Sequence, residues 1–529
     1  MKRIKLKTGV IPLVLGVFLM LSCQKIIFRS SYEKSNSFLN RTQNTGEKEF
    51  LKAHLKNGEV YIWGLDWSID EKKNAIVGKG YQYNAYRKLI KEGDLELPIS
   101  EVAIFETNQV LDDAESSRIG ALTVLGVADW ALGVFCLINP KACFGSCPTF
   151  YLNPNSNYHY ADAEGFSSAT LPRLAYADAD ALPQLPAQSN FEINMRNEAM
   201  ETHVIKGVRL KVFPKEGGKT VLQTSDHRFY STSNAVQPVK ATGFEGNILP
   251  ALLKEDHFER FSLAHSSSMQ HQETVELEFE KTEANRLGLQ LSFRQTLMTT
   301  YLFYSALDDM GEDFAEYYAK MESTGESFMQ HFSPMKKLLG GIQVEVFDES
   351  KKQWISAGNF GEIGPIAIEK QMIELPQVTT KNRVKIRLNM NQGLWRIDAA
   401  KLVGIEKEVQ PMVVEASGMY DRITKKNLPL PTTEKPLVTF PGRQVQWKFS
   451  LPSPGNEWVA FLESEGYYLE WSRSSWIKDK NMGRLMSMGL TPKSFLKKEI
   501  KAYKKFEETM EREFWDSRFT SKELVYENR

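Results

Sequence analysis

The sequence has no excess of charge of either sign and none of the common catalytic signatures. Lys and Arg together number 66, and so do Asp and Glu, so the formal net charge is zero. A nucleic-acid partner favours a concentrated basic face, so we expect no nucleic acid among the partners. The patterns G-x-S-x-G, H-E-x-x-H, G-x-x-x-x-G-K-S/T and G-x-G-x-x-G are absent, which leaves no motif for a known enzyme class. Carboxylate-based hydrolases follow no spacing rule, so an enzyme of that kind stays open.

Residues 1–22 have the features of a lipoprotein signal peptide. A basic start precedes a run of thirteen almost wholly apolar residues, 9–21, which is too short to span a membrane as a helix. The segment Met20-Leu21-Ser22-Cys23 resembles the bacterial lipobox, in which the cysteine is acylated and becomes the new N-terminus. A plain secretory signal that happens to contain Cys23 is the alternative. Residues 23–48 are mostly polar and predict a flexible tether.

An acylated Cys23 would anchor the protein firmly, because each buried CH₂ of an acyl chain contributes about 0.8 kcal/mol. We therefore expect a lipid-anchored protein of the outer membrane, on its periplasmic or its cell-surface side. Such a compartment is oxidising, and thiols there tend to form disulfides.

Cysteine is scarce, with four in the chain. The spacing of Cys143 and Cys147 around Gly145 can close a small loop, and we predict a disulfide between them. A zinc site, which needs four N, O or S ligands, and a redox pair, which usually has the spacing C-x-x-C, are the alternatives. Cys136 lies in an apolar run and is expected to be a buried thiol.

The rest of the chain predicts a mainly β, multidomain protein that combines a small barrel with β-sandwich modules. The hairpin signal Asn57-Gly58 and the alternation in residues 341–403 favour strands. The predicted order is a small barrel-like domain (49–118), an apolar helix or hairpin (119–142), a β domain with the disulfide loop (143–284), a jelly-roll-like β-sandwich (285–410) with a helical insertion (303–338), a β segment (411–478) and a C-terminal helical region (479–529).

Residues 119–138 form a second apolar run, and its twenty residues could span a bilayer. Asp129 in its middle argues against this, because an acid at the bilayer centre is costly. A buried helix or hairpin is the favoured interpretation, and a membrane-inserted segment is the alternative.

The region between residues 147 and 203 holds the densest group of potential ligands. Calcium takes six to eight oxygens, often from such loops, but the D-x-D-x-D-G series of a calcium loop is absent. Turn and capping roles for these side chains are the favoured interpretation, and a Ca²⁺, Zn²⁺ or polar-ligand site is the alternative. The candidates are His159, Asp162, Glu164, Asp178, Asp180, Glu198, Glu201 and His203.

Two further segments could form binding surfaces. Tyr467, Tyr468, Trp471 and Trp476 could stack on sugars, although core packing is the favoured interpretation. Residues 491–519 predict a long helix with an apolar stripe and a lysine-rich first half. Docking of the stripe onto the body is favoured, and contact with a partner or with anionic lipid is the alternative.

Several strings together resemble a family of uncharacterised predicted lipoproteins of Gram-negative bacteria. The strings are NPKACFGSCPTFY (139–151), AEGFSSA (163–169), NEAMETHVI (197–205), RQTLMTTYLFY (294–304), GLWRIDAAKLVG (393–404) and GYYLEW (466–471). The resemblance covers nearly the whole mature chain, and it implies no activity, substrate or catalytic residue. The segment YADADAL (176–182) departs from the form expected for the family, which is closer to ATDVDAL. The departure weakens the case for a metal site with fixed ligand positions in this loop.

From these observations we expect a membrane-anchored binding or assembly module for a protein partner or an envelope polymer. An accessory subunit of an outer-membrane complex would be one form of it. The alternatives are a glycan-binding lipoprotein, which would use the 341–403 sandwich or the aromatic residues, and a carboxylate-based hydrolase.

Overall fold

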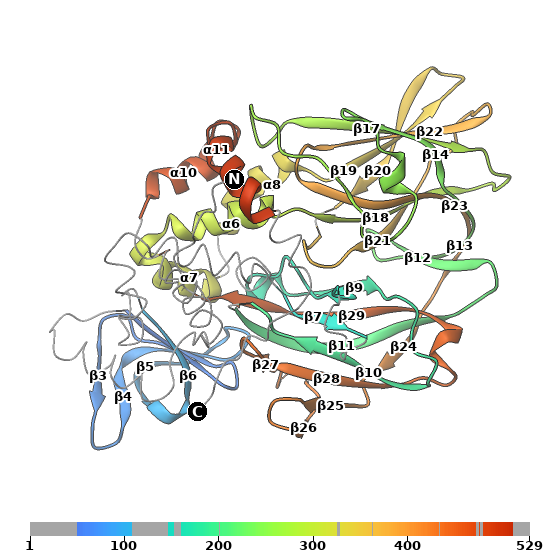
Figure 1. Ribbon diagram of the computed structural model, residues 1–529. Coiled ribbons are helices and arrows are strands. Elements are labelled where there is room, and N and C mark those ends of the chain that lie inside the picture. Colours follow the sequence, from blue (N-terminus) through green and yellow to red (C-terminus); the bar gives the residue numbers. More distant parts are fainter. Residues whose placement is uncertain are drawn as a thin grey trace, which may run out of the picture.

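The computed structural model describes residues 50–107, 147–152, 160–199, 201–324, 328–361, 363–432, 434–471, 476 and 480–511. Several predictions therefore lie outside the described residues: the signal and lipidation at Cys23, the apolar run 119–138, and the candidate residues Cys143 and His159. The described chain is mainly β, with five sheets and a smaller group of helices (Figure 1), which confirms the predicted fold class.

The N-terminal sheet forms a half-barrel with an apolar core of its own, in which Trp63, Ile76 and Leu97 are buried. The predicted hairpin at Asn57-Gly58 is present: β1 and β2 pair antiparallel, and Gly58 has a φ of +86°, which suits glycine. The strands of the half-barrel are β1 (Leu51–Leu55), β2 (Val60–Ile62), β3 (Trp67–Asp70), β4 (Ala75–Tyr83), β5 (Leu89–Pro98) and β6 (Val102–Thr107).

Two sheets form the next layer, which we call the first sheet pair. One sheet has the order β26-β25-β28-β10-β7-β8, and the other has the order β24-β11-β29-β9, with β27 also paired to β11. Their strands are β7 (Thr149–Tyr151), β8 (Ala163–Glu164), β9 (Tyr176–Ala181), β10 (Asn190–Arg196), β11 (Glu201–Pro214), β24 (Met412–Glu415), β25 (Gly418–Asp421), β26 (Lys426–Leu428), β27 (Leu437–Thr439), β28 (Gln444–Ser450) and β29 (Trp458–Glu470).

Two further sheets form the second sheet pair. One has the order β13-β12-β21-β18-β23-β16, and β13 also pairs with β23, so the strands from β13 to β23 in this order close into a ring and β16 lies outside it. The other has the order β15-β14-β17-β22-β19-β20. Their strands are β12 (Lys219–Thr224), β13 (Phe229–Val236), β14 (Pro238–Gly243), β15 (Gly246–Asn247), β16 (Arg260–Phe261), β17 (Gln272–Glu280), β18 (Leu287–Gln295), β19 (Ile342–Asp348), β20 (Gln353–Phe360), β21 (Glu369–Glu374), β22 (Arg383–Asn391) and β23 (Trp395–Val409).

Periodicity explains these elements locally. In β17, QETVELEFE, the apolar residues alternate with polar ones and are buried, as in a sheet with one face toward the core. The chain completes β11, builds the second sheet pair, and then returns to the first. There β29 pairs with β11 from Glu201↔Glu470 to Pro214↔Trp458. The first sheet pair is thus assembled from two segments separated by the whole second pair.

The helices lie together on one side of the sheets, between the half-barrel and the second sheet pair (Figure 1). α11 docks through its predicted stripe, since Phe495, Ile500 and Tyr503 are buried. No helix among the described residues is both long and apolar enough to cross a membrane. The helices are α6 (Met298–Asp308), α7 (Phe314–Thr324), α8 (Phe328–Leu339), α10 (Met482–Leu490) and α11 (Pro492–Phe506), which continues as a π-helical turn over Glu507–Glu511.

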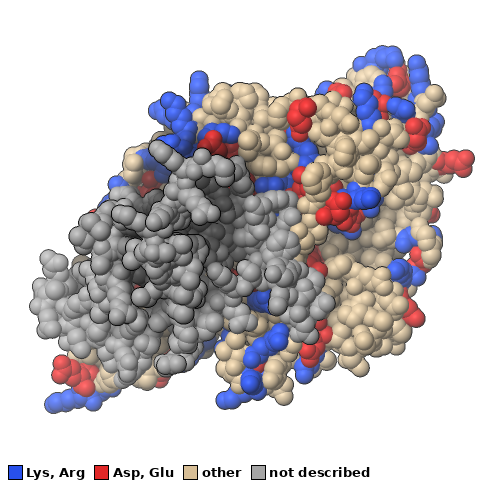
Figure 2. Space-filling model, in the orientation of Figure 1, with Lys and Arg blue, Asp and Glu red and all other residues tan. Residues whose placement is uncertain are grey.

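Charge is distributed unevenly on the surface. Over much of the face in Figure 2 the acidic and basic side chains are interspersed. Lys and Arg gather at the end of the molecule where Figure 1 places α10 and α11.

Candidate functional site

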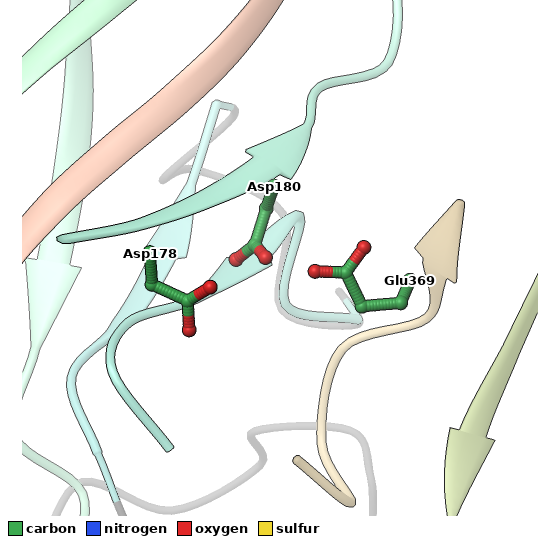
Figure 3. Close-up of side chains that lie close together, drawn as sticks. All are labelled: Asp178, Asp180 and Glu369. Atoms are coloured by element: carbon green, nitrogen blue, oxygen red, sulfur yellow. The ribbon is translucent and has the colours of Figure 1, made fainter. Parts of the chain in front are cut away.

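Three carboxyl groups meet where the first sheet pair faces the second. Asp178 and Asp180 come from β9, an outer strand of its sheet, and Glu369 begins β21. Their side chains point toward one another (Figure 3), and one carboxylate oxygen of each lies within 4.8 Å of the others. Asp178 and Asp180 share a face because side chains two residues apart in a strand point the same way. We call these three residues the acid cluster.

Glu164 in β8 connects the acid cluster to the loop before β21. Its backbone amide donates a hydrogen bond of 2.5 Å to Oδ2 of Asp180. Its carboxylate Oε2 accepts hydrogen bonds from the backbone amides of Ile366, at 2.8 Å, and Ala367, at 2.9 Å. Gly364 passes so close that a Cβ there would overlap the Glu164 carboxylate. The position of Glu164 is therefore set from both sheet pairs.

The polar contacts continue through Cys147 to β11. The Cys147 thiol donates to Oε1 of Glu164 at 3.1 Å, and its backbone amide donates to Oε2 of Glu201 at 3.2 Å. The same Glu201 oxygen lies 3.1 Å from Nε2 of His203. A buried chain of polar groups thus runs from Glu369 to His203.

Burial sets the charge state of His203. The side chain is fully buried, and burial lowers its pKa to about 3, so the imidazole is neutral near pH 7. A neutral ring that faces a carboxylate is expected to carry its proton on Nε2 and to donate it to Glu201. Nδ1 of His203 is buried and has no hydrogen-bond partner among the described residues.

Burial also disfavours the charged form of the acids. It raises the pKa of Glu164 to about 7 and that of Glu369 to about 7. It raises the pKa of Asp180 well above its usual range, and the neighbouring Glu369 and Asp178 raise it further. The pKa of Asp178 is also raised by burial, although Tyr176 and His227 act in the opposite direction. Near neutral pH these groups are therefore expected to share protons.

Two kinds of chemistry fit this arrangement. A set of carboxylate oxygens suits a hard cation such as Ca²⁺, whereas Zn²⁺ sites usually include nitrogen or sulfur ligands. The cation would replace the shared protons. Alternatively, neighbouring carboxyl groups with different proton affinities can act as a general acid and a base.

The structure brings five of the predicted ligand residues into one connected set: Glu164, Asp178, Asp180, Glu201 and His203. Asp162 and Glu198 lie outside this set and make other contacts. Asp162 accepts a hydrogen bond of 2.7 Å from the Leu152 amide through Oδ2, and Glu198 accepts hydrogen bonds of 2.6 Å from Thr149 and Tyr151.

Sequence reasoning missed Glu369, which lies far along the chain in an ordinary strand pattern and carries no local signal. It also treated Cys147 only as half of a disulfide. Because Cys143 lies outside the described residues, the predicted Cys143–Cys147 bridge stays a prediction.

The four aromatic residues proposed as a sugar platform are all buried. Tyr467 is 0%, Tyr468 3%, Trp471 3% and Trp476 5% exposed. Nε1 of Trp471 donates to Thr202 Oγ1 at 2.9 Å. These side chains pack in the core, as the favoured interpretation held, and they do not offer their faces to a sugar.

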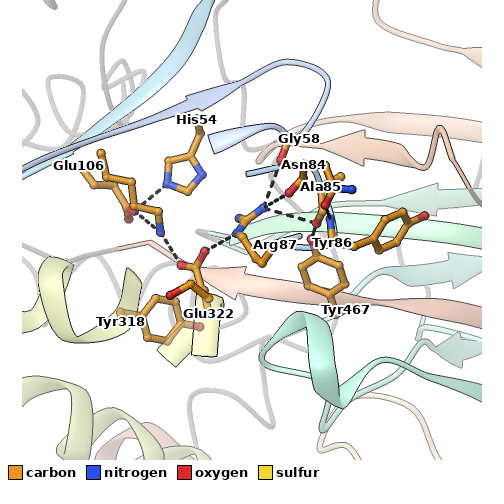
Figure 4. Close-up of polar contacts among 12 residues, drawn as sticks. His54, Gly58, Asn84, Ala85, Tyr86, Arg87, Glu106, Tyr318, Glu322 and Tyr467 are labelled. Carbon is orange, nitrogen blue, oxygen red and sulfur yellow. Dashed lines mark hydrogen bonds and ion pairs between the residues drawn. The ribbon is translucent and has the colours of Figure 1, made fainter. Parts of the chain in front are cut away.

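A second polar cluster joins the half-barrel to α7 (Figure 4). Glu322 of α7 contacts Lys52 Nζ through Oε1 and accepts a hydrogen bond of 2.7 Å from Arg87 Nε through Oε2. Lys52 also lies 3.1 Å from Oε2 of Glu106, which in turn lies 2.7 Å from Nε2 of His54. All five side chains are buried. We call this set the half-barrel junction.

Comparison with known proteins identifies no family: no family model and no curated protein matches the chain. Among solved structures, a beta-porphyranase of glycoside hydrolase family 86 from the human gut bacterium Bacteroides plebeius is 9% identical. The match covers 47% of this chain and 40% of the enzyme, with a TM-score of 0.16. An alpha-xylosidase of family 31 from Xanthomonas citri is 6% identical over 80% of this chain and 37% of the enzyme, with a TM-score of 0.14. The matches span less than half of either enzyme, and scores this low carry no functional inference.

Proposed function

We propose that the protein is a lipid-anchored outer-membrane lipoprotein that binds a protein partner and acts as an assembly module. The anchor is supported by the lipobox-like segment that ends at Cys23. The binding role is supported by one observation above the others, an exposed apolar surface on the half-barrel.

This surface is centred on one face of the β4–β5 pair, where the register brings Tyr81, Tyr83 and Leu89 together. Leu65, before β3, and Ile90 are further exposed apolar residues of the half-barrel. Four large apolar side chains are exposed: Leu65 by 60%, Tyr81 by 42%, Leu89 by 47% and Ile90 by 52%. The rings of Tyr81 and Tyr83 stack with centroids 6.2 Å apart, and Leu89 is the cross-strand partner of Tyr83. Single exposed apolar residues are ordinary, but grouped ones mark contact sites. We call this the β4–β5 surface.

The half-barrel is suited to transmit a contact to the rest of the chain. Its own core keeps its shape, and the half-barrel junction ties it to α7 through Glu322. A partner on the β4–β5 surface would therefore be held in a defined orientation relative to the body, as an assembly subunit requires.

Site-specific photo-crosslinking in envelope membranes tests the proposal. We would replace Ile90 with p-benzoylphenylalanine in the full chain, and use the same replacement at Phe244 as the control, because Phe244 is 64% exposed in the second sheet pair. A discrete adduct at position 90, absent at 244 and weakened by Cys23→Ala, is expected. Equal crosslinking at both positions, or none at 90, would contradict the proposal.

A carboxylate-based hydrolase is the second candidate, favoured by the raised pKa of Glu164 and Glu369 beside Asp178 and Asp180. Assays on envelope polysaccharides with wild type, Asp180→Asn and Glu369→Gln would test it. An activity that both substitutions abolish would support a hydrolase. Inactivity of the wild type would contradict the hydrolase hypothesis. Glycan binding, if present, would have to use the sandwich surface rather than the buried aromatic residues.

A further inference from the structure

We propose that the outer face of α11, together with the end of α10, contacts the anionic phospholipid surface of a membrane. The proposal concerns a different surface from the β4–β5 surface and does not rest on the lipid anchor.

α11 divides its charged and apolar residues between two faces. The inner face is docked on the protein through Phe495, Leu496, Ile500 and Tyr503, which are 0 to 4% exposed. The outer face is exposed and basic, and its lysines recur at helical spacing along the whole helix. They are Lys493, Lys497, Lys498, Lys501 and Lys505. We call this outer face the lysine face.

The one acid within α11, Glu499, does not lie on the lysine face. Glu499 lies on the docked side, where its carboxylate accepts a hydrogen bond of 2.8 Å from Arg484. Among the described residues, Lys493, Lys497, Lys498 and Lys501 have no acidic partner, whereas Glu499 pairs with Arg484 and Lys504 with Glu507. Because the protein as a whole has zero net charge, this is a local concentration of positive charge.

Two large apolar side chains are exposed on α10, the helix that leads into α11. Met486 is 57% and Leu490 68% exposed at the end of α10, and Thr491 leads directly into α11. Figure 2 shows basic side chains gathered at this end of the molecule. Lysines beside exposed aliphatic groups are the combination that helices at a membrane surface use: the cations meet lipid phosphates and the aliphatic groups enter the headgroup boundary.

The kind of cation also favours lipid over a folded protein partner. All five cations are lysines, whose ammonium groups are compact charges on flexible stems. Such groups suit mobile headgroups, whereas a fixed carboxylate is better recognised by the planar fork of arginine. Contact here would orient the body of the protein on the membrane.

Amide hydrogen exchange of the full chain in the presence of lipid vesicles tests the proposed membrane contact. The readout is the exchange rate of the peptide that contains α10 and α11, so it reports on this surface alone. Phosphatidylcholine vesicles with and without phosphatidylglycerol are compared at low and high salt. Slower exchange of this peptide is expected only with phosphatidylglycerol and only at low salt, because salt screens the attraction.

A charge variant and a matched control complete the design. In K493Q/K497Q/K498Q/K501Q the lipid-induced slowing should be lost, whereas K56Q/K72Q/K88Q/K91Q, which removes four exposed half-barrel lysines, should keep it. Unchanged exchange in lipid-free buffer would show that both variants are folded. Unaltered exchange of the wild type with phosphatidylglycerol, equal slowing by neutral vesicles, or slowing by an acidic protein but not by lipid would overturn the proposal.

Discussion

Arg87 and Glu322 lie 235 positions apart in the sequence, yet Nε of Arg87 donates a hydrogen bond of 2.7 Å to Oε2 of Glu322. Glu322 also contacts Lys52, so a single carboxylate of α7 serves two cations of the half-barrel. Burial would raise the pKa of Glu322, but Lys52 and Arg87 outweigh it and keep the pKa below its usual value. The carboxylate therefore stays charged and holds the junction.

Glu322→Gln should destabilise the protein strongly, because it leaves two buried cations without their partner. We expect a loss of about 3–5 kcal/mol, measured from the urea midpoint of Trp fluorescence. Glu316→Gln, on an exposed face of the same helix, is the control and should change little. Similar midpoints for the two variants would show that the junction is not a stabilising contact.

The acid cluster and the adjoining Glu164 predict a pH dependence of defined sign. Glu164 and Glu369 have pKa values raised from 4.5 to about 7, so the folded protein binds more protons than the unfolded chain between these values. Their contribution to stability is complete below pH 4.5 and is lost as the pH rises toward 7, on the order of 3 kcal/mol for Glu164.

Variants that cannot ionise test this sign. The free energy of unfolding of Asp180→Asn or Glu369→Gln, relative to wild type, should improve as the pH rises from 4.5 to 7. Glu276→Gln, on an exposed position of β17, should track the wild type at every pH. A difference that stays constant with pH would mean that the acids titrate normally.

Gly364 should tolerate no side chain. Its missing Cβ makes room for the Glu164 carboxylate, which the amides of Ile366 and Ala367 hold in place. Gly364→Ala should cost about 1–3 kcal/mol in thermal or urea unfolding. Gly361→Ala is a matched control three residues away, because a Cβ there meets nothing within 4 Å. Equal effects of the two substitutions would place the Glu164 carboxylate elsewhere.

Calcium should bind to the acid cluster in competition with protons. Isothermal titration is expected to show binding of Ca²⁺ that strengthens as the pH rises through about 7, with release of protons. Asp180→Asn should abolish the heat, and Asp162→Asn, which alters the contact to Leu152 outside the acid cluster, should retain it. No heat for the wild type at any pH would leave the cluster as a proton-sharing contact alone.

Cys147 links the predicted disulfide to the acid cluster. A bridge to Cys143 would remove the S–H that now donates to Glu164, a contact that lowers the pKa of Glu164. In protein from envelopes, both cysteines should be alkylated only after reduction, as read by mass spectrometry. Cys143→Ser should make Cys147 reactive after unfolding without reductant. Alkylation of both residues in unreduced wild type would exclude the bridge.

Local patterns in the sequence were sufficient for much of the fold. The Asn57-Gly58 turn, the alternation in β17 and the apolar stripe of α11 each depend on neighbours within a few positions. The acids of β9 could also be recognised, because a strand places Asp178 and Asp180 on one face.

Other features required contacts between distant segments. β29 returns to pair with β11 after the whole second sheet pair, and this brings 412–470 beside 149–214. Glu369 joins the acid cluster for the same reason, since β21 reaches β9 only through the packing of two sheet pairs. For Tyr467 and Trp471 the sequence favoured core packing over sugar binding, and burial confirmed it.

The difference between the features that the sequence predicted and those that required the structure has a physical cause. Local patterns sufficed for the β-rich composition and the turns, because those depend on short-range geometry and on hydrophobicity summed over a segment; the membrane address remains a prediction from the same kind of pattern. The strand pairings and the charges that share a buried site became visible only in the folded structure. Those outcomes depend on long-range packing, and burial then changes the proton affinity of groups that look ordinary in the chain.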